Sequence, residues 1–338
     1  MSTTAKTPIK LTRSDFKTDQ DVRWCPGCGD YAILAQFQKV FPTLGIKREN
    51  FVIISGIGCA ARFPYYMNTY GFHTIHGRAP ALATGLKVMR KDLSVWVITG
   101  DGDALSIGGN HLIHSLRRNV NLKIVLFNNQ IYGLTKGQYS PTSEVGKRTK
   151  SSPFGSIDEP FKPLSVAIGA EATFIARTLD REQKHLAAML QAAAGHQGTA
   201  FVEVYQNCNI FNDGAFLHMT DKAVKQHHQL IVEHGKPLVF NQGTQGIVFE
   251  GFAPRVVDVA EVGLDAIAVH DEAGEVGYHM ALARMRDPEF PTAIGVIRRT
   301  SRPVYDDEVE AQVEATKQKD GPGQLHELLH SGHTWVVE

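Results

Sequence analysis

Short apolar runs recur through the first two thirds of the chain, and each ends in a polar or glycine-rich segment. Runs of this length and composition are typical of strands that are buried on both faces of a parallel sheet. The predicted strands are 51–55, 95–99, 122–127, 172–176 and 200–205. Helical patterns lie at 31–41, 76–91, 108–118, 162–168 and 181–194. This alternation predicts an α/β fold, a mostly parallel sheet with helices on both faces.

The pattern loosens beyond Asn212. Weaker signals predict helices over 220–234 and 278–286, a strand over 266–271 and a charged, partly helical tail from Asp306. We therefore expect three parts along the chain. They are an N-terminal arm (1–23), an α/β domain (24–213) and a C-terminal extension (214–338) that packs on the domain or on a partner subunit.

Polar side chains follow two of the predicted strands at the point where each strand ends. Asp101 and Asp103 come directly after the run 95–99, and Asn129 comes after the run 122–127. A strand, a helix and a strand in this order form a βαβ unit, so both clusters are expected at the carboxyl ends of neighbouring strands. Ligands of open α/β sheets bind at this edge.

These side chains are suited to Mg²⁺, which prefers oxygen ligands and completes its shell with phosphate oxygens and water. We expect Asp101, Asn129 and the backbone carbonyl of Ile131 to hold the ion. The glycines around Asp101 allow backbone N–H groups to approach a diphosphate beside a helix N-terminus. The alternative at this point is that Asp101 caps a turn and that 128–129 is an ordinary loop.

The four cysteines allow three interpretations. Cys25 and Cys28 form a C-x-x-C motif, while Cys59 and Cys208 each follow a predicted strand. A thioredoxin-like dithiol would follow a βαβ-type strand, and 18–23 is a poor strand. A zinc ribbon would need a second C-x-x-C pair, which the sequence lacks. A [4Fe-4S] cluster would use all four thiols, and it is the interpretation that we favour.

The loop after the first predicted strand satisfies G-x-G-x-x-A, through Gly56, Gly58 and Ala61. A nicotinamide site would place an acidic residue roughly 20 positions further on. The segment 73–78 contains no acid, so this interpretation is disfavoured. If the loop borders the diphosphate site instead, a cluster held through Cys59 lies close to the cofactor.

Three basic side chains are candidates for anion binding. His76 and Arg78 precede a predicted helix, and a helix N-terminus together with a guanidinium suits an anion. Lys136 is the nearest cation after the metal motif and could meet a substrate carboxylate. The alternatives are a histidine satisfied in the core, a surface arginine and a solvated lysine.

Composition excludes several classes of protein. The 338 residues include 35 basic and 35 acidic side chains, so no net field favours nucleic acid or a membrane surface. No apolar run approaches the ~20 residues of a spanning helix, and the polar N-terminus has no signal-peptide core. We therefore expect a cytoplasmic protein, in which cysteines serve as metal ligands or redox groups more often than as disulfides.

At these residues the sequence resembles known families. Gly100-Asp101-Gly102, followed after 26 residues by Asn129, is similar to the metal–diphosphate motif of thiamine diphosphate enzymes. Together with the cysteine motifs and the segment 131–138, it resembles the β subunit of 2-oxoacid:ferredoxin oxidoreductases. The form of 131–138 looks most like the 2-oxoglutarate branch. The resemblance covers about Arg23 to Asp213.

The resemblance implies a set of site residues. Cys25, Cys28, Cys59 and Cys208 would ligate a [4Fe-4S] cluster, and Leu134 would support the bent cofactor. Candidate catalytic residues are Lys136, His76 and Arg78. Candidate cofactor-binding residues are Gly56, Ile57, Gly58, Cys59, His76, Gly77, Arg78, Gly100, Asp101, Gly102, Asp103, Asn129, Ile131, Gly133, Leu134 and Thr135.

The resemblance also implies an activity. It is the coenzyme A-dependent oxidative decarboxylation of 2-oxoglutarate to succinyl-CoA and CO₂, with electrons passed through the cluster to ferredoxin. The activating glutamate of the pyrimidine-binding domain would come from an α subunit, in an (αβ)₂ heterotetramer, because this chain has room for only one such domain. The alternatives are pyruvate or another 2-oxo acid as substrate, or an electron-transfer subunit without catalysis.

Overall fold

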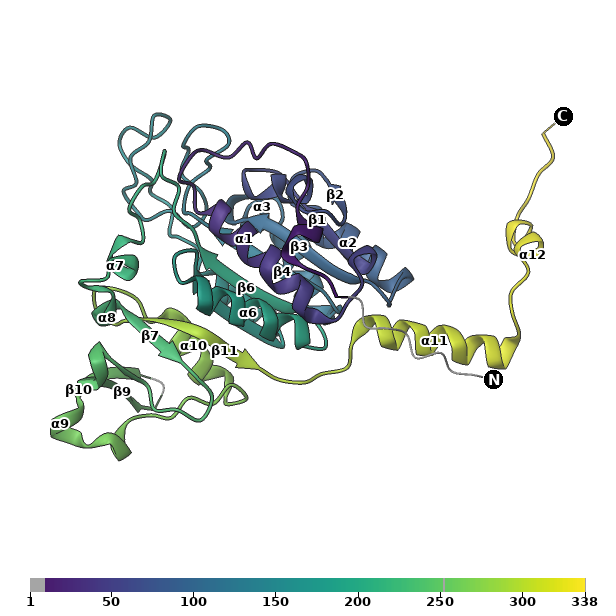
Figure 1. Ribbon diagram of the computed structural model, residues 1–338. Coiled ribbons are helices and arrows are strands. Elements are labelled where there is room, and N and C mark those ends of the chain that lie inside the picture. Colours follow the sequence, from purple (N-terminus) through teal and green to yellow (C-terminus); the bar gives the residue numbers. More distant parts are fainter. Residues whose placement is uncertain (1–9, 252, 338) are drawn as a thin grey trace.

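The computed structural model of the chain describes residues 10–251 and 253–337 (Figure 1). Its strands are β1 Phe51–Ser55, β2 Tyr70–His73, β3 Ser94–Gly100, β4 Lys123–Asn128, β5 Phe174–Leu179, β6 Ala200–Tyr205, β7 Gln229–Val232, β8 Val239–Phe240, β9 Gln245–Glu250, β10 Ala253–Asp258 and β11 Thr292–Arg299. Its α-helices are α1 Asp30–Val40, α2 Ala79–Met89, α3 Asp101–Leu105, α4 Gly109–Arg118, α5 Pro163–Gly169, α6 Gln183–Gly195, α7 Leu217–Thr220, α8 Lys225–His228, α9 Val259–Val262, α10 Val276–Arg284, α11 Tyr305–Asp320 and α12 Leu325–Leu329. The 3₁₀ helices are η1 Arg13–Phe16, η2 Phe41–Leu44, η3 Arg48–Asn50, η4 Ala60–Tyr66, η5 Asn241–Gly243 and η6 Leu264–Ala266.

An eight-stranded sheet forms the centre of the molecule, with strand order β2-β1-β3-β4-β6-β5-β11-β7. The pairs from β2 to β5 are all parallel, and β11 joins β5 in the antiparallel sense. The mostly parallel sheet is thus confirmed. Because β1, β3, β4 and β6 are neighbours with the same direction, their carboxyl ends meet at one edge.

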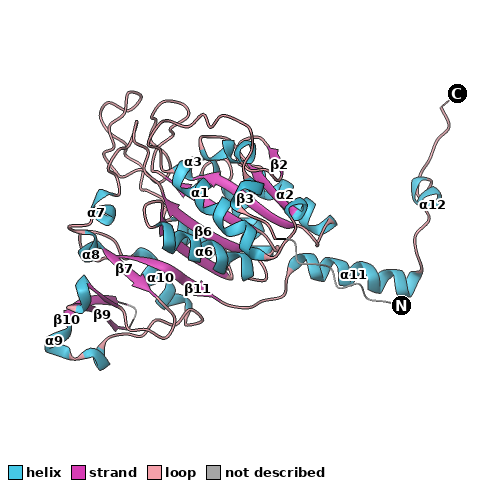
Figure 2. Ribbon diagram, in the orientation of Figure 1, coloured by secondary structure: helices cyan, strands magenta, loops and turns pink. Residues whose placement is uncertain are grey.

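Helices cover both faces of this sheet (Figures 1 and 2). Successive strand residues point to opposite faces, so Trp96 and Ile98 belong to one core and Val95 and Val97 to the other. The first core packs against α1 and α6, and the second packs against α2, α4, α5 and α10. Burial on both faces explains why the strands are continuous apolar runs.

The elements predicted for the first two thirds of the chain are confirmed to within three residues. The strands at 51–55 and 200–205 have the predicted bounds, and the helix predicted over 31–41 is α1. The exposed edge strand β2 was not predicted. All four of its residues are exposed, so it lacks the apolar run that identifies a buried strand.

The last third departs from the prediction. The helix expected over 220–234 is wrong, because the segment contains the short helix α8 and then β7, which pairs with β11. The strand expected over 266–271 is wrong as well, since only an isolated bridge between Val269 and Pro237 lies there. β7 and β11 extend the main sheet, and β8, β9 and β10 form a second one. Their pairing partners are distant in sequence, which a local pattern does not report.

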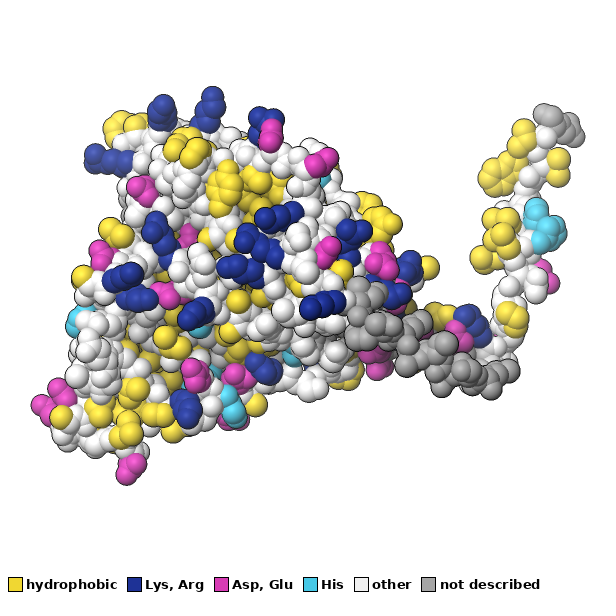
Figure 3. Space-filling model, viewed as in Figure 1, with side chains coloured by type: hydrophobic (Ala, Val, Ile, Leu, Met, Phe, Trp, Pro, Cys, Tyr) yellow, Lys and Arg dark blue, Asp and Glu magenta, His cyan; other side chains and the backbone are white. Residues whose placement is uncertain are grey.

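The tail leaves the body as α11 and then α12 (Figure 1). Lys91 forms ion pairs with Asp307 and Glu310 and fixes the start of α11. Hydrophobic side chains remain uncovered along the projecting segment, among them Leu328 and Trp335 (Figure 3). Within 10–251 and 253–337, none of the helices has the length and apolar character that crossing a membrane requires.

Candidate functional site

A cavity of about 550 Å³ opens at the carboxyl edge of β1, β3 and β4. The segments that follow these strands and β6 supply its walls, together with the start of α1. The predicted site residues that line it are Ile57, Gly58, Cys59, His76, Gly100, Asp101, Gly102, Asp103, Asn129, Ile131, Gly133, Leu134 and Thr135. Most of the predicted cofactor-binding residues are therefore brought together. The other predicted site residues lie outside the lining: Gly56, Gly77, Arg78, Lys136, Cys25, Cys28 and Cys208.

Asp101 is the first residue of α3 and is buried. Its Oδ2 accepts hydrogen bonds from the Ser140 hydroxyl at 2.5 Å and from the Thr142 hydroxyl at 2.6 Å. Burial raises the pKa of Asp101 to about 6, and the two hydroxyls act in the opposite direction. A carboxylate that is costly to bury without a cation is a suitable anionic ligand for a metal.

Asn129 follows β4 and is held from three sides. Its Nδ2 donates to Gln206 Oε1 at 2.9 Å, and its Oδ1 accepts the backbone N–H of Ile131 at 3.2 Å. Its backbone carbonyl accepts a hydrogen bond from Asn212 Nδ2 at 2.9 Å. The intervening Gln130 has a positive φ of 56°, which turns the chain sharply at this point.

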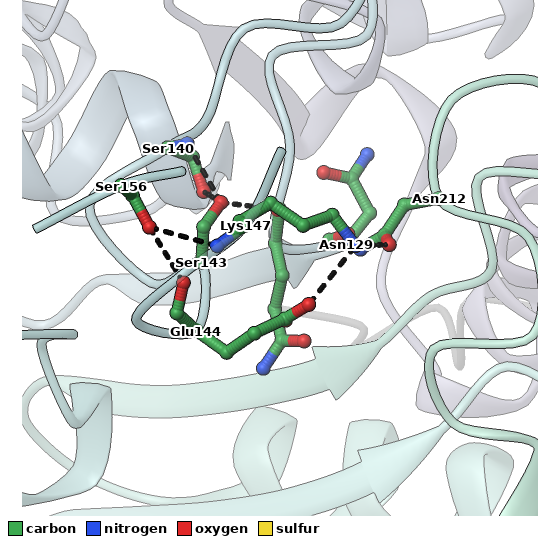
Figure 4. A network of polar contacts seen from close by, with 8 residues as sticks. Asn129, Ser140, Ser143, Glu144, Lys147, Ser156 and Asn212 are labelled. Atoms are coloured by element: carbon green, nitrogen blue, oxygen red, sulfur yellow. Dashed lines mark hydrogen bonds and ion pairs between the residues drawn. The ribbon is translucent and has the colours of Figure 1, made fainter. Parts of the chain in front are cut away.

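The loop 140–156 folds beside Asn129 and is tied to it by polar contacts (Figure 4). Ser143 donates to the carbonyl of Gln130, and Ser156 donates to the carbonyl of Glu144. Lys147 Nζ donates to Asn212 Oδ1, and Asn212 in turn holds Asn129. The end of β4, which precedes the proposed metal ligand Asn129, is therefore fixed by the loop that follows it in sequence.

Asp103 makes contacts that the sequence did not predict. Its Oδ1 accepts backbone N–H groups from Ile57 at 3.1 Å and from Gly77 at 2.8 Å, and its Oδ2 accepts the Thr99 hydroxyl at 2.7 Å. The buried carboxylate thus holds the loop after β1 and the loop before α2 against α3. These contacts are with the protein, whereas the sequence predicted a contact with a cofactor.

Several glycines are required by close packing. A Cβ on Gly102 would lie 2.1 Å from the Tyr132 ring, and one on Gly56 would lie 1.9 Å from Asp103 Oδ2. A Cβ on Gly77 would lie 2.4 Å from the backbone of Gly108. Gly58 has a φ of 118° and open space around it. The glycines thus bring three loops together, and Gly58 leaves open space beside the cavity.

Cys28, Cys59 and Cys208 lie beside this cavity. The Sγ atoms of Cys59 and Cys208 lie 3.5 and 3.6 Å from the position that a Cβ on Gly133 would take. Cys28 Sγ accepts a hydrogen bond from Gln206 Nε2 at 3.3 Å. Cys25 is exposed, and the other three are partly buried.

The surroundings of Cys28 and Cys59 disfavour the thiolate form of both side chains. Burial, followed by the charge of Asp30, raises the pKa of Cys59 to about 12 and also raises the pKa of Cys28. Binding as thiolates would therefore need a strongly cationic partner. Within 10–251 and 253–337, no three His, Cys, Asp or Glu side chains are grouped so as to hold a metal ion as they stand.

Two polar residues of the cavity were missed by the sequence analysis. Asp30 is 1% exposed, and within the described part of the chain neither of its oxygens has a hydrogen-bond partner. Burial raises its pKa to about 7. Gln206 is also 1% exposed and lies between Asn129 and Cys28. The available signals were the position of Asp30 after the C-x-x-C motif and that of Gln206 at a strand end.

The three predicted basic residues differ in their contacts and in their position relative to the cavity. His76 is exposed and lines the cavity. The Arg78 guanidinium donates to the carbonyls of His76 and Ile107, at 3.2 and 3.3 Å. Lys136 is exposed in the left-handed conformation, with a φ of 77°, on the turn next to the wall residue Thr135.

Comparison with known proteins gives a consistent result. The family model described as "Thiamine pyrophosphate enzyme, C-terminal TPP binding domain" matches residues 56–204. The 2-oxoglutarate oxidoreductase subunit KorB of Mycobacterium tuberculosis is 55% identical over 329 residues, which are 96% of this chain and 88% of that protein. The 2-oxoglutarate synthase subunit KorB of Methanocaldococcus jannaschii is 43% identical over 185 residues, which are 55% of this chain and 68% of that protein.

A solved structure is similar along nearly the whole chain. It is 2-oxoglutarate:ferredoxin oxidoreductase from Magnetococcus marinus with 2-oxoglutarate, coenzyme A and succinyl-CoA bound. The TM-score is 0.75, the sequence identity is 32%, and the match covers 96% of each chain. The chain belongs to the family of 2-oxoacid:ferredoxin oxidoreductase β subunits, and its sheet and cavity are those of a thiamine pyrophosphate-binding domain.

Proposed function

We propose that this chain is the β subunit of a 2-oxoglutarate:ferredoxin oxidoreductase. The reaction takes 2-oxoglutarate and coenzyme A to succinyl-CoA and CO₂, and the two electrons released pass to ferredoxin. The observation that carries the proposal is that Asp101, Asn129 and Cys59 line one cavity. Relatives named for 2-oxoglutarate support the choice of substrate.

The donor set fits Mg²⁺ and thiamine diphosphate. Asp101 offers the anionic oxygen, while Asn129 and the Ile131 carbonyl offer neutral oxygens, which are the ligand types that Mg²⁺ prefers. The open space around Gly58, at the wall that Asp101 also lines, leaves room for a diphosphate to approach the backbone. Bound thiamine diphosphate supplies a nucleophilic centre for the keto carbon and an electron sink for decarboxylation.

The thiols fit an iron–sulfur cluster. Cys59 lines the cavity, Cys208 lies against Gly133 of the same wall, Cys28 contacts Gln206, and Cys25 precedes Cys28 by three residues. Four thiolates around a cationic iron core would offset the raised thiol pKa values. Such a cluster supplies a one-electron carrier next to the cavity.

The chain's own residues prepare the cavity for this chemistry. Asp103 holds the loops after β1 and before α2. Asn212, which accepts a hydrogen bond from Lys147 of the loop 140–156, holds Asn129. Leu134 is 46% exposed at the cavity wall, where it can support an apolar part of the cofactor. His76 offers an imidazole at the same wall. Lys136 provides a cation on the adjacent turn for the second carboxylate of 2-oxoglutarate.

The partner completes the site. A family β subunit implies an α subunit, and we assign to it the glutamate that activates the aminopyrimidine. We assign ferredoxin as the electron acceptor and an (αβ)₂ heterotetramer in the cytoplasm as the assembly. Coenzyme A is the acyl acceptor, as the ligands of the Magnetococcus marinus structure indicate for that enzyme.

The test is a substrate panel on the assembled enzyme. The chain is co-produced anaerobically with its α subunit, and viologen reduction is measured with coenzyme A and each of several 2-oxo acids. We expect the highest kcat/KM with 2-oxoglutarate and no turnover without coenzyme A. A preference for pyruvate by tenfold or more would contradict the proposed substrate but leave the family intact.

A further inference from the structure

Gln206 occupies a position between the two proposed cofactor sites. It is the first residue after β6, and its backbone N–H pairs with the Asn128 carbonyl at 3.0 Å. The backbone therefore continues the sheet without any help from the side chain. The side chain is 1% exposed and belongs to the cavity wall.

Three hydrogen bonds use the Gln206 amide. Oε1 accepts from Asn129 Nδ2 at 2.9 Å, while Nε2 donates to the Asn207 carbonyl at 2.5 Å and to Cys28 Sγ at 3.3 Å. The Asn207 contact fixes the orientation of the amide, because the reversed amide would bring two carbonyl-type oxygens together. One buried amide therefore contacts both a proposed metal ligand and a proposed cluster ligand.

The contact with Asn129 determines which atom that residue can offer to a metal. Since Nδ2 is bound to Gln206, the amide of Asn129 is held with Oδ1 directed away from Gln206. Asn129 Oδ1 also accepts the Ile131 N–H at 3.2 Å, so loss of the Gln206 contact would leave that one bond to hold the amide. Only the oxygen of the amide can bind Mg²⁺. Polar groups that orient a metal ligand in this way commonly change metal affinity by roughly 10–100-fold when removed.

The contact with Cys28 acts on the charge of the sulfur. An N–H donor stabilises negative charge on a thiolate, and hydrogen bonds to cluster sulfurs favour the reduced form. Without this donor, the reduction potential of a cluster bound through Cys28 would become more negative.

We propose that Gln206 is a positioning residue that connects the two sites. It orients Asn129 toward the Mg²⁺ of thiamine diphosphate and at the same time stabilises the Cys28 thiolate of the cluster. This inference rests on the proposed function, and it adds a residue that sets the geometry of the cofactor site and the potential of the neighbouring electron acceptor together.

The test compares two substitutions with a matched control. Gln206→Leu removes all three hydrogen bonds at similar volume. Gln206→Glu keeps an oxygen for Asn129 but places an acid beside Cys28. The control is Gln312→Leu, because Gln312 is an exposed glutamine of α11 outside the cavity lining. All are made in the complex with the α subunit and purified anaerobically.

Three quantities are measured: iron content, thiamine diphosphate affinity at saturating Mg²⁺ by calorimetry, and the midpoint potential of the cluster by an EPR-monitored redox titration. We expect Gln206→Leu to weaken thiamine diphosphate binding by roughly tenfold and to shift the potential to more negative values. Gln206→Glu should lose less affinity and shift the potential further. Gln312→Leu should change neither the thiamine diphosphate affinity nor the midpoint potential.

If Gln206→Leu lowered the melting temperature but left the thiamine diphosphate affinity and the midpoint potential unchanged, the inference would be overturned. Gln206 would then have only a packing role. A change at one site alone would also overturn it, since the proposed role is a connection. Wild-type complex that contains neither iron nor thiamine diphosphate would instead refute the proposed function, so the two failures are distinguishable.

Discussion

The carboxylate of Asp103 accepts the backbone N–H of Gly77 at 2.8 Å, across 26 positions of sequence. The same oxygen accepts the N–H of Ile57, two residues before Cys59. A Cβ at Gly77 would collide with the backbone of Gly108, so the loops approach each other as closely as the chain allows. Asp103 therefore fixes the spacing between the cysteine-bearing loop and the loop that carries His76.

Replacement of Asp103 tests this arrangement. Asp103→Ala leaves two backbone N–H groups without an acceptor, at a cost of about 1–3 kcal/mol for each buried group. We expect the free energy of unfolding from urea titration to fall by about 2–4 kcal/mol and thiamine diphosphate binding to weaken. Asp265→Ala, at an exposed position of η6, is the control. A loss no larger than that of the control would remove the proposed role of Asp103.

Asp101 should reduce the stability of the metal-free protein. Burial raises its pKa from 3.8 to about 6, so the folded state binds the proton more tightly than the unfolded chain does. The stability of chelator-treated protein should therefore decline as the pH rises from about 4 to 6. Asp101→Asn should remove this decline, gain about 1–3 kcal/mol at pH 7 and lose thiamine diphosphate binding. Urea titrations at pH 5 and 7, with calorimetry, measure both effects, and a less stable Asp101→Asn protein would count against the assignment.

The sequence allowed the cavity to be located, because its residues follow consecutive strands. Parallel strands that alternate with helices must end at the same edge, so Asp101 and Asn129 could be paired without coordinates. The role of Asp103 was not predictable, since its partners are backbone N–H groups of loops whose approach depends on glycine contacts. Gln206 was missed for a similar reason, because its bonds to Asn129 and Cys28 span distant segments.

The C-terminal third was predicted least well for a related reason. β7 and β11 are strands only because each completes a sheet begun elsewhere in the chain. The segment 220–234 has local helical character, and its parallel pairing with β11 overrides that preference in β7. Local patterns therefore located the elements buried on both faces but not those that depend on distant partners.

His196 should make the fold sensitive to acid. It lies after α6, contacts the Thr173 hydroxyl at 2.8 Å, and has its pKa lowered to about 4 by burial and then by Lys123 and Arg299. The unfolded chain takes up the proton near pH 6.5 and the folded chain does not, so stability is lost as the pH falls from 6.5 toward 4.

The comparison is made with the variant His196→Gln. Between pH 7 and pH 5, we expect the wild type to lose about 1 kcal/mol more than the variant, after allowance for partial solvent exposure. His333→Gln, on the exposed tail, should behave as the wild type does. Parallel pH profiles for the wild type and His196→Gln would show that His196 does not titrate in this way.

Lys136 should contribute to the choice of substrate. The charged side chain lies on a turn next to Thr135 and Gln138, both of which line the cavity. A charge-assisted contact with the second carboxylate of 2-oxoglutarate is worth ~1.5–3 kcal/mol, so Lys136→Met should lower kcat/KM for 2-oxoglutarate by roughly tenfold or more. Activity with 2-oxobutyrate should be spared, and Lys236→Met serves as the control at an exposed position.

Other outcomes would reassign Lys136. A parallel loss with both substrates, restored by a higher concentration of coenzyme A, would place the lysine at the site of the acyl acceptor. Equal kcat/KM values for Lys136→Met and Lys236→Met would leave it as a solvated side chain.

The central claim is that the cavity lined by the proposed metal–diphosphate residues Asp101 and Asn129 reaches the proposed cluster through Cys59, which lines the same cavity. EPR spectroscopy of the anaerobic complex with its α subunit, frozen after 2-oxoglutarate is added, tests this claim most directly. We predict the signal of a reduced [4Fe-4S] cluster in the wild type, and no such signal after Asp101→Asn although the iron content is unchanged. Stoichiometric zinc in place of iron, or a cluster that is reduced equally in Asp101→Asn, would contradict the account.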